Sequence, residues 1–423
     1  MSKQTKATLV PKLRFPEFRG AEAWEQVPLD KLADRVTTRN QGGDCTRVLT
    51  NSAEHGVVDQ RDYFDKDIAT AGNLDGYYVV DRGDYVYNPR ISKVAPVGPI
   101  SRNNIGQGVM SPLYTVFRFK NEITDFYSHY FKTTCWHSYL RQVASTGARH
   151  DRMSISVADF AAMPVPAPIP AEQQKIASCL SSVDELIAAQ ARKLDALKTH
   201  KKGLMQNLFP REGETQPRLR FPEFQNAGEW VEKTLGSIGS FASGGTPSKD
   251  NPDYWNGSIP WVSASSMYDL VVETADHYVT PLAIGKGTRI AKKGSILILV
   301  RGSMLFKRVP ICIAGIDVAF NQDVKALVVN APIDTGFLLY QLSAFQSRLP
   351  INETGIGAGK IELDHLKGFE LFIPTPPEQR RIATCLTALD DLIAAQTQKL
   401  EALKIHKKGL MQQLFPSPKE LDV

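Results

Sequence analysis

The sequence predicts an α+β protein in which two mixed strand-and-loop domains are separated by two long helices that form an antiparallel coiled coil. Three observations predict this fold: an internal duplication, a heptad pattern near the end of each copy, and short strand patterns within each copy. Since both copies belong to one chain, we expect a pseudo-twofold internal repeat.

The duplication is the strongest signal. Residues 170–210 and 376–416 match without a gap, at an offset of 376 − 170 = 206, and about two thirds of their positions are identical. The hexapeptide Leu-Arg-Phe-Pro-Glu-Phe begins at Leu13 and again at Leu219, and Trp24 matches Trp230 at the same offset. Between these matching ends the two copies share little, which predicts one architecture carrying two different surfaces.

Each of the two matching segments has a coiled-coil pattern of apolar residues in two seams seven residues apart. A proline-rich stretch begins each segment and a Phe-Pro pair ends it, and about 37 residues at ~1.5 Å each give a rod of roughly 55 Å. The residues expected to pair the helices are Ile176, Leu180, Val183, Ile187, Leu194 and Leu197 in the first copy and Ile382, Leu386, Leu389, Ile393, Leu400 and Leu403 in the second.

The alternative is that each long helix packs only on its own domain. The narrow seam favours a helix partner over a broad globular core, and the near-identical second helix is the obvious partner. Polar seam residues would then fix the register at some cost in stability, and we assign this role as a hypothesis to Gln190, Gln396, Lys201 and Lys407.

The divergent regions are expected to contain short strands and polar loops. Alternating or continuous apolar runs predict strands at 77–80, 84–87 and 114–119 in the first copy and at 295–300 and 326–329 in the second. The loops between them are rich in Arg, Lys, Asn and Ser, the side chains that read base edges and hold phosphates in DNA. Any single loop of this composition is equally consistent with an ordinary solvated turn.

The strongest candidates for DNA contact are two segments that begin near a Thr-Gly pair, 145–152 and 354–360, where glycine permits close backbone approach. Together with the polar loops they give the candidate DNA-binding residues Arg90, Lys93, Arg149, His150, Arg152, Lys249, Arg301, Lys307 and Lys360.

Composition and residue spacing argue against disulfide-rich, metal-binding, membrane and secreted proteins. Net charge is only +5, which fits a nucleic-acid partner but does not demand one. The five cysteines are scattered, with no CxxC spacing, so neither a disulfide framework nor a thiolate metal site is expected. No apolar run is long enough for a membrane span and the first residues lack a signal-peptide core, so we expect a cytoplasmic protein.

Catalytic motifs are incomplete. The run 355–361 resembles a phosphate loop but has Thr354 and Ile361 where Gly and Ser/Thr are required. Residues 251–254 resemble the Asn/Asp-Pro-Pro-Tyr/Phe loop of amino-methyltransferases, with Asp253 in place of the second proline, and Asp323-Val324-Lys325 is too short to indicate a nuclease. We therefore expect a non-catalytic chain with no metal.

At the level of whole motifs, the chain resembles the specificity subunits of type I restriction–modification enzymes. The resemblance covers essentially the whole chain. It rests on the two helices that begin at Glu172-Gln173 and Glu378-Gln379, on the Leu-Arg-Phe-Pro-Glu-Phe hexapeptides, and on a Gly-Gly-Thr-Pro pattern at 244–247 followed by Tyr254-Trp255 and Ile259-Pro260-Trp261.

The resemblance implies a first target-recognition domain at 1–168, a spacer helix at 169–212, a second target-recognition domain at 213–375 and a second spacer helix at 376–423. It implies that each domain reads one half of a split, asymmetric double-stranded DNA target. It further implies that the helices set the gap and dock two modification subunits.

The implied modification subunits carry S-adenosylmethionine and methylate adenine flipped out of the duplex, and the implied restriction subunits use ATP and Mg. This chain itself is expected to bind no cofactor. Three alternatives stay open: a coiled-coil scaffold that reads no DNA, an enzyme with an unrecognised site, and a subunit of a complex that only methylates.

Overall fold

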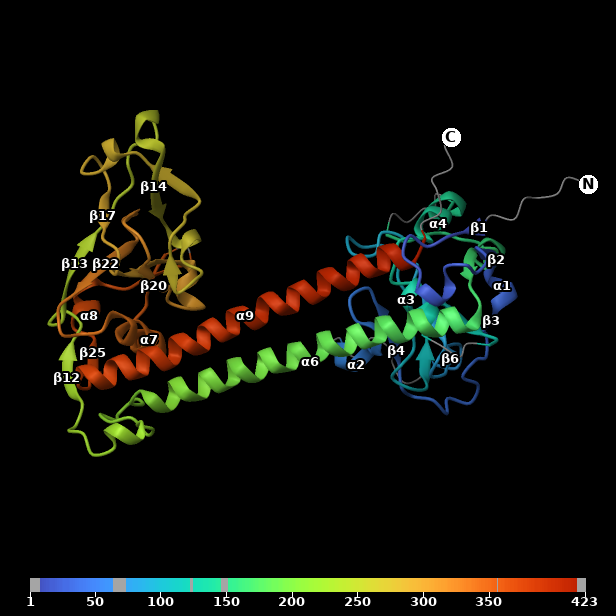
Figure 1. Ribbon diagram of the computed structural model, residues 1–423, viewed down its shortest axis with the longest axis horizontal. Coiled ribbons are helices and arrows are strands. Elements are labelled where there is room, and N and C mark those ends of the chain that lie inside the picture. The colour runs from blue at the N-terminus through green and yellow to red at the C-terminus, as the bar shows by residue number, and fades with distance from the viewer. Residues whose placement is uncertain (1–7, 64–73, 122–124, 146–150, 356, 417–423) are drawn as a thin grey trace, which may run out of the picture. The chain divides into compact units, whose positions relative to one another are not determined.

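The computed structural model describes residues 8–63, 74–121, 125–145, 151–355 and 357–416 (Figure 1). The chain divides into two compact units. Unit 1 comprises residues 1–191 and 399–423, and unit 2 comprises residues 192–398. The division falls inside both long helices, α6 (Pro170–Leu208) and α9 (Pro376–Leu414), each of 39 residues. Each unit therefore contains one globular part and one half of each long helix.

The globular part of unit 1 is made of short strands and short helices. Its four-stranded sheet has the order β3-β10-β7-β8, and smaller sheets are formed by β1-β2-β11, β4-β5 and β6-β9. The strands are β1 (Thr8–Leu9), β2 (Trp24–Pro28), β3 (Ala33–Arg35), β4 (Leu49–Ser52), β5 (Gly56–Asp59), β6 (Tyr78–Val80), β7 (Tyr85–Tyr87), β8 (Ile100–Arg102), β9 (Gly108–Met110), β10 (Thr115–Phe119) and β11 (Pro164–Ala167). The helices are η1 (Pro16–Phe18), α1 (Leu29–Leu32), α2 (Gln60–Tyr63), α3 (Phe126–Tyr130), α4 (His137–Val143) and α5 (Val157–Ala161).

Unit 2 has a five-stranded sheet, β13-β22-β18-β20-β15, a four-stranded sheet, β16-β14-β21-β17, a three-stranded sheet, β19-β24-β23, and the pair β12-β25. The strands are β12 (Val231–Thr234), β13 (Gly239–Ser243), β14 (Trp255–Val262), β15 (Val271–Val272), β16 (His277–Val279), β17 (Arg289–Ala291), β18 (Ile296–Leu299), β19 (Arg301–Gly302), β20 (Ile311–Ala314), β21 (Val318–Phe320), β22 (Val324–Val329), β23 (Asn352–Thr354), β24 (Ala358–Lys360) and β25 (Glu370–Ile373). The helices are η2 (Pro222–Phe224), η3 (Pro252–Tyr254), η4 (Ala264–Ser266), η5 (Pro281–Ala283), η6 (Ser303–Phe306), α7 (Thr335–Phe345), η7 (Gln346–Arg348) and α8 (Leu363–Lys367).

The two globular parts share one topology even where their sequences do not match. The order β3-β10-β7-β8 recurs as β13-β22-β18-β20, to which β15 adds an edge strand. The register recurs as well: Tyr87 pairs with Ile100, and 298 − 87 = 211 residues later Ile298 pairs with Ile311. The predicted α+β class and internal repeat are therefore confirmed, and the repeat extends into the divergent regions.

A tryptophan kept in both copies anchors each core. Trp24 packs edge-on against Phe126 of α3 with ring centroids 5.8 Å apart, and Trp230 packs in the same way against Phe337 of α7, also at 5.8 Å. The aromatic residue that ends a long helix joins each cluster, with Phe415 in unit 1 and Phe209 in unit 2. The Phe-Pro pair expected only to stop the helix thus also supplies core.

The long helices run antiparallel within each unit. In unit 1, Asp184 of α6 is paired with Lys407 of α9, while the earlier residue Leu180 shares a core cluster with the later residue Leu414. In unit 2 the end of α6 meets the start of α9, since Leu208 of α6 shares a cluster with Ile382 of α9. In Figure 1, α7 lies against the first turns of α9, the part of that helix that belongs to unit 2.

Candidate nucleic-acid interface

In unit 1 the loop after β7 meets the segment that precedes α5. Arg90 and Arg152 form an antiparallel bridge, although they lie 62 residues apart in the sequence (152 − 90). The amide of Ile91 donates to the carbonyl of Asp151 at 3.0 Å, and that of Met153 donates to the carbonyl of Pro89 at 2.9 Å. Two candidate residues chosen from separate loops are thus adjacent.

Unit 2 places a basic pair in the same position. Arg301 pairs with Lys360 across β19 and β24, and the amide of Ile361 donates to the carbonyl of Val300 at 2.8 Å. Val300 corresponds to Pro89 at the offset of 211 residues set by the sheets. Although the two regions share almost no sequence, each presents two basic residues at one point of the fold.

The four side chains of these pairs are not equivalent electrostatically. Arg90 and Arg301 are exposed, whereas Arg152 and Lys360 are half-buried. Lys360 Nζ lies 2.7 Å from Glu362, and Arg152 Nε lies 3.7 Å from Asp151. The exposed arginine of each pair therefore reaches solvent, and its half-buried partner is held near a carboxylate.

Lys325 on β22 is a basic residue that the sequence reasoning missed. Burial lowers the pKa of Lys325, Asp323 opposes this shift, and the nearby Lys360 ammonium adds to it. Lys325 therefore lies close enough to the Arg301–Lys360 pair to interact with it. Lys325 stands between two buried apolar residues of β22. In the sequence this position looks like any solvated position of a strand, so the pattern alone did not mark it as a site residue.

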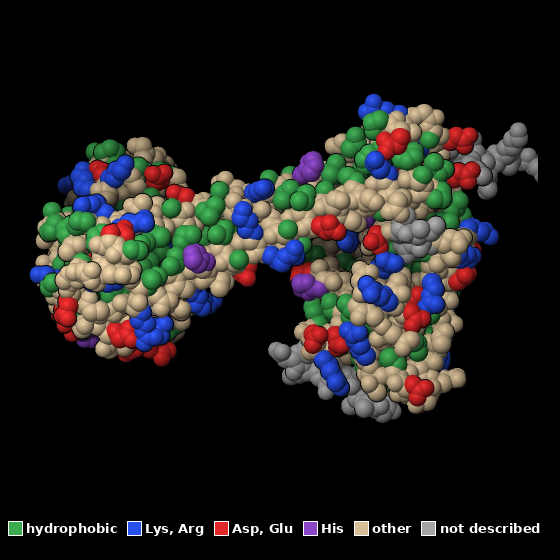
Figure 2. Space-filling model, turned by 60° about the horizontal axis from the view of Figure 1, so that its bottom comes forward, with side chains coloured by type: hydrophobic (Ala, Val, Ile, Leu, Met, Phe, Trp, Pro, Cys, Tyr) green, Lys and Arg blue, Asp and Glu red, His purple; other side chains and the backbone are tan. Residues whose placement is uncertain are grey.

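The remaining candidates have separate positions. Lys93 is exposed in the loop after Arg90, and Lys249 is exposed before η3. Lys307 is exposed directly after η6, whose Leu305 lies against Gly359 of β24 and hence near the pair of unit 2. Arg149 and His150 lie outside the described residues. On the face shown in Figure 2, basic and acidic side chains are interspersed, so positive charge gathers only locally.

The Gly-Gly-Thr-Pro segment is a packing element. A Cβ on Gly244 would lie 2.1 Å from the carbonyl oxygen of Phe320, and one on Gly245 would lie 2.0 Å from that of Gly287. The Trp261 indole donates to the carbonyl of Gly245 at 3.0 Å. The loop thus lies directly against the β14–β21 sheet, and its glycines serve that close approach.

The repeated hexapeptide is joined to the repeated helix by a buried ion pair. Arg14 donates from Nε and Nη2 to the two carboxylate oxygens of Glu172, both at 2.7 Å. Arg220 makes the same bidentate contact with Glu378 at 2.9 and 2.6 Å. The hydrogen bonds that each arginine donates to its glutamate raise the pKa of the arginine, and both glutamates are buried. This contact explains why both motifs are kept in both copies.

The residues expected to pair the helices are all covered. Six of them are buried and six are half-buried, and the first two of each helix also belong to the globular core of their own unit. The seam lysines form ion pairs across the helices, Lys201 with Asp390 and Lys407 with Asp184, each at 2.5 Å. Gln190 is buried and Gln396 is half-buried.

Among the described residues, no three His, Cys, Asp or Glu side chains are grouped so that they could hold a metal ion. Burial raises the pKa of Cys135, the cysteine nearest to a histidine in the sequence. None of the described helices combines the length and the apolar character that crossing a bilayer requires.

The duplicated topology defines a class of protein with two globular parts built on one repeated frame, each with a basic pair at the same point of the fold. The chain belongs to the family of the type I restriction modification DNA specificity domain, whose family model matches residues 70–199 and 227–404. It is therefore a type I restriction–modification specificity subunit with DNA-recognition domains, as its resemblance implied.

Individual relatives agree with this family. The chain is 29% identical over 270 residues to the EcoR124I/EcoR124II specificity subunit of Escherichia coli, a match covering 62% of this chain and 64% of that protein. It is 28% identical over 182 residues to the MjaIX specificity subunit of Methanocaldococcus jannaschii, a match that covers 42% of this chain and 41% of that protein. The chain thus matches less than two thirds of the length of these relatives.

Solved structures share the fold. A chain from a study of complex assembly in a type I restriction–modification system has a TM-score of 0.57 at 17% identity, with 93% of this chain and 97% of that chain covered. The type I restriction–modification S subunit from M. genitalium has a TM-score of 0.54 at 15% identity, with 97% of this chain and 100% of that chain covered.

Proposed function

We propose that this chain reads a bipartite, asymmetric sequence in double-stranded DNA, one half with each unit, and catalyses no reaction by itself. The observation that carries the proposal is the recurrence of a basic pair at one position of the fold, Arg90 with Arg152 and Arg301 with Lys360. Guanidinium and ammonium groups bind phosphates, and arginine also pairs with guanine in the major groove. Because the surrounding loops differ, the two half-sites differ.

The long helices supply the spacing in this proposal. A helix of 39 residues is about 58 Å long at ~1.5 Å per residue. Half-sites on one face of B-DNA are separated by about 34 Å per helical turn, which a rod of this length spans. The buried ion pairs at Glu172 and Glu378 support the role, since they fix the start of each helix to its own globular part.

Two modification subunits are the proposed protein partners, docked on the helices and followed by restriction subunits. Support comes from the duplication, because two copies of one docking surface suit two copies of one partner. S-adenosylmethionine would belong to the modification subunits, and ATP with Mg to the restriction subunits. We also propose the division into recognition domains at 1–168 and 213–375 and spacer helices at 169–212 and 376–423.

Sequencing of methylated sites in the host tests the proposal. The full chain, expressed with its modification subunit, should direct methylation to a two-part motif with a fixed gap. Arg90→Ala should relax or weaken recognition of one half of the motif only, and Arg301→Ala recognition of the other half. Arg149→Ala should affect the same half as Arg90→Ala, and Lys360→Ala the same half as Arg301→Ala. Replacing residues 25–165 with those of another family member should change one half of the motif.

The control is Lys286→Ala, which removes a cation from an exposed turn of unit 2. It should leave the motif and the methylation level unchanged. Binding to duplex DNA should also weaken as salt rises, with a smaller slope in Arg90→Ala than in the unmodified chain. Methylation without a two-part motif would overturn the proposal, as would Arg90→Ala and Arg301→Ala changing the same half.

A further inference from the structure

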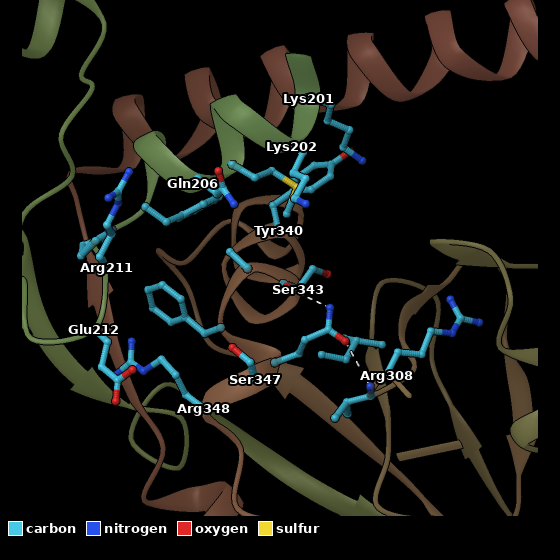
Figure 3. Close-up of a pocket in the computed structure, with 18 of the residues that line it drawn as sticks. Lys201, Lys202, Gln206, Arg211, Glu212, Arg308, Tyr340, Ser343, Ser347 and Arg348 are labelled. Carbon is cyan, nitrogen blue, oxygen red and sulfur yellow. Dashed lines mark hydrogen bonds between the residues drawn. The ribbon is translucent and has the colours of Figure 1, made fainter. Parts of the chain in front are cut away.

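Unit 2 contains a cavity that the DNA-reading proposal does not use. Its volume is about 870 Å³, and its walls come from the end of α6 with residues 210–212, from α7 and η7, and from the turn before β20 (Figure 3). None of the candidate DNA-binding residues lines it. The cavity therefore needs an explanation of its own.

The lining is strongly basic. Six cationic residues face one carboxylate, that of Glu212, and the cationic residues are Lys198, Lys201, Lys202, Arg211, Arg308 and Arg348. Lys201 is neutralised by Asp390, and Arg308 donates to the carbonyl of Met267. For the other four, the described residues provide no ion pair. Arg211 lies close enough to Glu214 to lower the pKa of that carboxyl, so an acidic ligand would meet chiefly the positive charges of Lys198, Lys202 and Arg348.

One of these cations has a donor that is already desolvated. The Arg348 guanidinium lies 4.4 Å from the ring centroid of Phe345 and 5.6 Å from that of Phe369. Its Nη1 is buried and has no hydrogen-bond acceptor among the described residues. A buried donor without an acceptor costs free energy, which a carboxylate in the cavity would remove.

Between the cations the wall is apolar and aromatic. Phe209 and Phe345 are buried, and Met205, Leu270 and Tyr340 complete this part of the lining. Figure 3 shows the cations on different sides of the cavity: Lys201 and Lys202 on the helix, Arg211 and Arg348 on one flank, and Arg308 on the other. Donors spread in this way suit several separate carboxylates better than one compact phosphate group, which needs converging donors.

The exposed wall residues of α6 also recur in the second copy of the helix. Lys198, Lys202 and Gln206 have the identical counterparts Lys404, Lys408 and Gln412, 206 residues later, and all six side chains are exposed. Core packing explains why buried positions stay identical after a duplication, but it does not explain identity at exposed positions. Contact with another molecule is one physical reason for such identity, and the charge of the cavity is the separate observation that points to a ligand.

We infer that this cavity binds an acidic polypeptide segment of a partner protein, with carboxylates on the surrounding cations and an apolar side chain against Met205 and Leu270. Duplex DNA fits less well, because its phosphates lie on a convex ridge of sugars that cannot fill an apolar recess. The volume is within the range of about 300–1,000 Å³ that is usual for ligand pockets. The inference rests on the proposed docking of partner subunits on the helices, since the cavity includes Lys198 and Lys202 of α6, and it shares no residue with the candidate DNA contacts.

Selection from a displayed library of random peptides, with the full chain as target, tests the inference. Enriched peptides should combine several Asp or Glu residues with at least one aromatic or aliphatic residue. A labelled peptide from this pool should bind the Lys198→Glu/Lys202→Glu variant at least tenfold more weakly than the unmodified chain. Both lysines are exposed, so the variant should keep the melting temperature of the parent.

Two further measurements make the result specific. The Lys286→Glu control should bind the peptide as the parent does, and Arg211→Glu should weaken binding. Because no candidate DNA contact is changed, the Lys198→Glu/Lys202→Glu variant should bind duplex DNA as the parent does, so failure of the peptide test is separable from failure of the DNA-reading proposal. Equal peptide binding by parent and variant would overturn the inference, and so would displacement of the peptide by duplex DNA with a matching loss of DNA affinity in the variant.

Discussion

The Lys201 ammonium lies 2.5 Å from Asp390 Oδ1, and the hydroxyl of Tyr340 donates to the other oxygen of the same carboxylate at 2.7 Å. The lysine comes from α6, the aspartate from α9 and the tyrosine from α7, so one carboxylate joins three helices of unit 2. Lys407 and Asp184 repeat the ion pair in unit 1. The two lysines that interrupt the apolar seams in the sequence thus form ion pairs between α6 and α9 in the fold.

Lys201→Met should lower the free energy of unfolding by about 1–3 kcal/mol, because methionine keeps the apolar stem and removes the charge that compensates Asp390. The side chains of the pair are only 16% and 26% exposed, so water screens them incompletely. Urea titration of the full chain measures the effect. Lys193→Met, at an exposed position of the same helix, is the control. Equal losses in both variants would show that the pair contributes nothing.

Glu172→Gln should destabilise unit 1 by about 3–5 kcal/mol, because it leaves the Arg14 cation without its bidentate partner at a site where the glutamate is 1% exposed. Lys175→Gln is a matched control on the same helix turn. It breaks the pair between Lys175 and Glu17, whose side chains are 50% and 43% exposed, and should leave the melting temperature nearly unchanged because water screens exposed charges. Thermal melting of both variants distinguishes them; melting curves that coincide would contradict the prediction.

Gly245→Ala should disrupt the loop at 244–247, because the new methyl group would lie 2.0 Å from the carbonyl oxygen of Gly287 and the backbone must shift. The expected loss is about 1–3 kcal/mol, together with changed fluorescence of Trp261, whose indole donates to Gly245. Gly228→Ala is the control, since nothing lies within 4 Å of its Cβ position. A Gly245→Ala protein as stable as Gly228→Ala, with unchanged fluorescence, would refute the packing role.

His129 should make unit 1 less stable in mild acid. Burial, and then the ammonium groups of Lys132 and Lys407, lowers the pKa of His129 to about 4, while Asp184 and Asp125 oppose the shift. Between pH 6.5 and 4 the unfolded chain takes up a proton that the folded chain excludes, so stability falls with pH across this range, by up to about 3 kcal/mol.

Replacing the ring tests this dependence. His129→Gln cannot titrate, so its melting temperature should fall less than that of the parent between pH 7 and pH 4.5. His137, whose pKa burial also lowers to about 4, remains in both proteins and contributes equally to their pH dependence. Parallel pH profiles for the parent and the variant would show that His129 is not responsible.

Much of the fold follows from local patterns. The predicted strands at 84–87 and 114–119 correspond to β7 and β10, and those at 295–300 and 326–329 to β18 and β22. A continuous apolar run marks β18, which is buried at every position, and alternation marks β10, where Arg118 is exposed between buried neighbours. The segment 354–360, a candidate for DNA contact, begins at the last residue of β23 and ends with β24, which pairs antiparallel with β23; its many glycines conceal this strand character in the sequence.

For the candidate sites, the sequence indicated which types of residue to expect but not which of them lie together. Composition selected Arg90 and Arg152 from two loops, but their bridge depends on which strands pair and in which register, and those are long-range properties. The same holds for Lys325, which lies near Lys360 only because β22 is next to β18 in the sheet. The assignment of these residues to DNA stays a prediction.

By itself the sequence determined the duplication, the heptad helices and the α+β class, because these depend on periodicities that residues carry along the chain. Tertiary structure alone decided which distant groups meet: Arg14 with Glu172, Lys201 with Asp390, and the basic pair of each unit. The physical reason is that a buried charge or a bridge between loops is stabilised by its partner in space, and folding selects that partner from many residues of the same type.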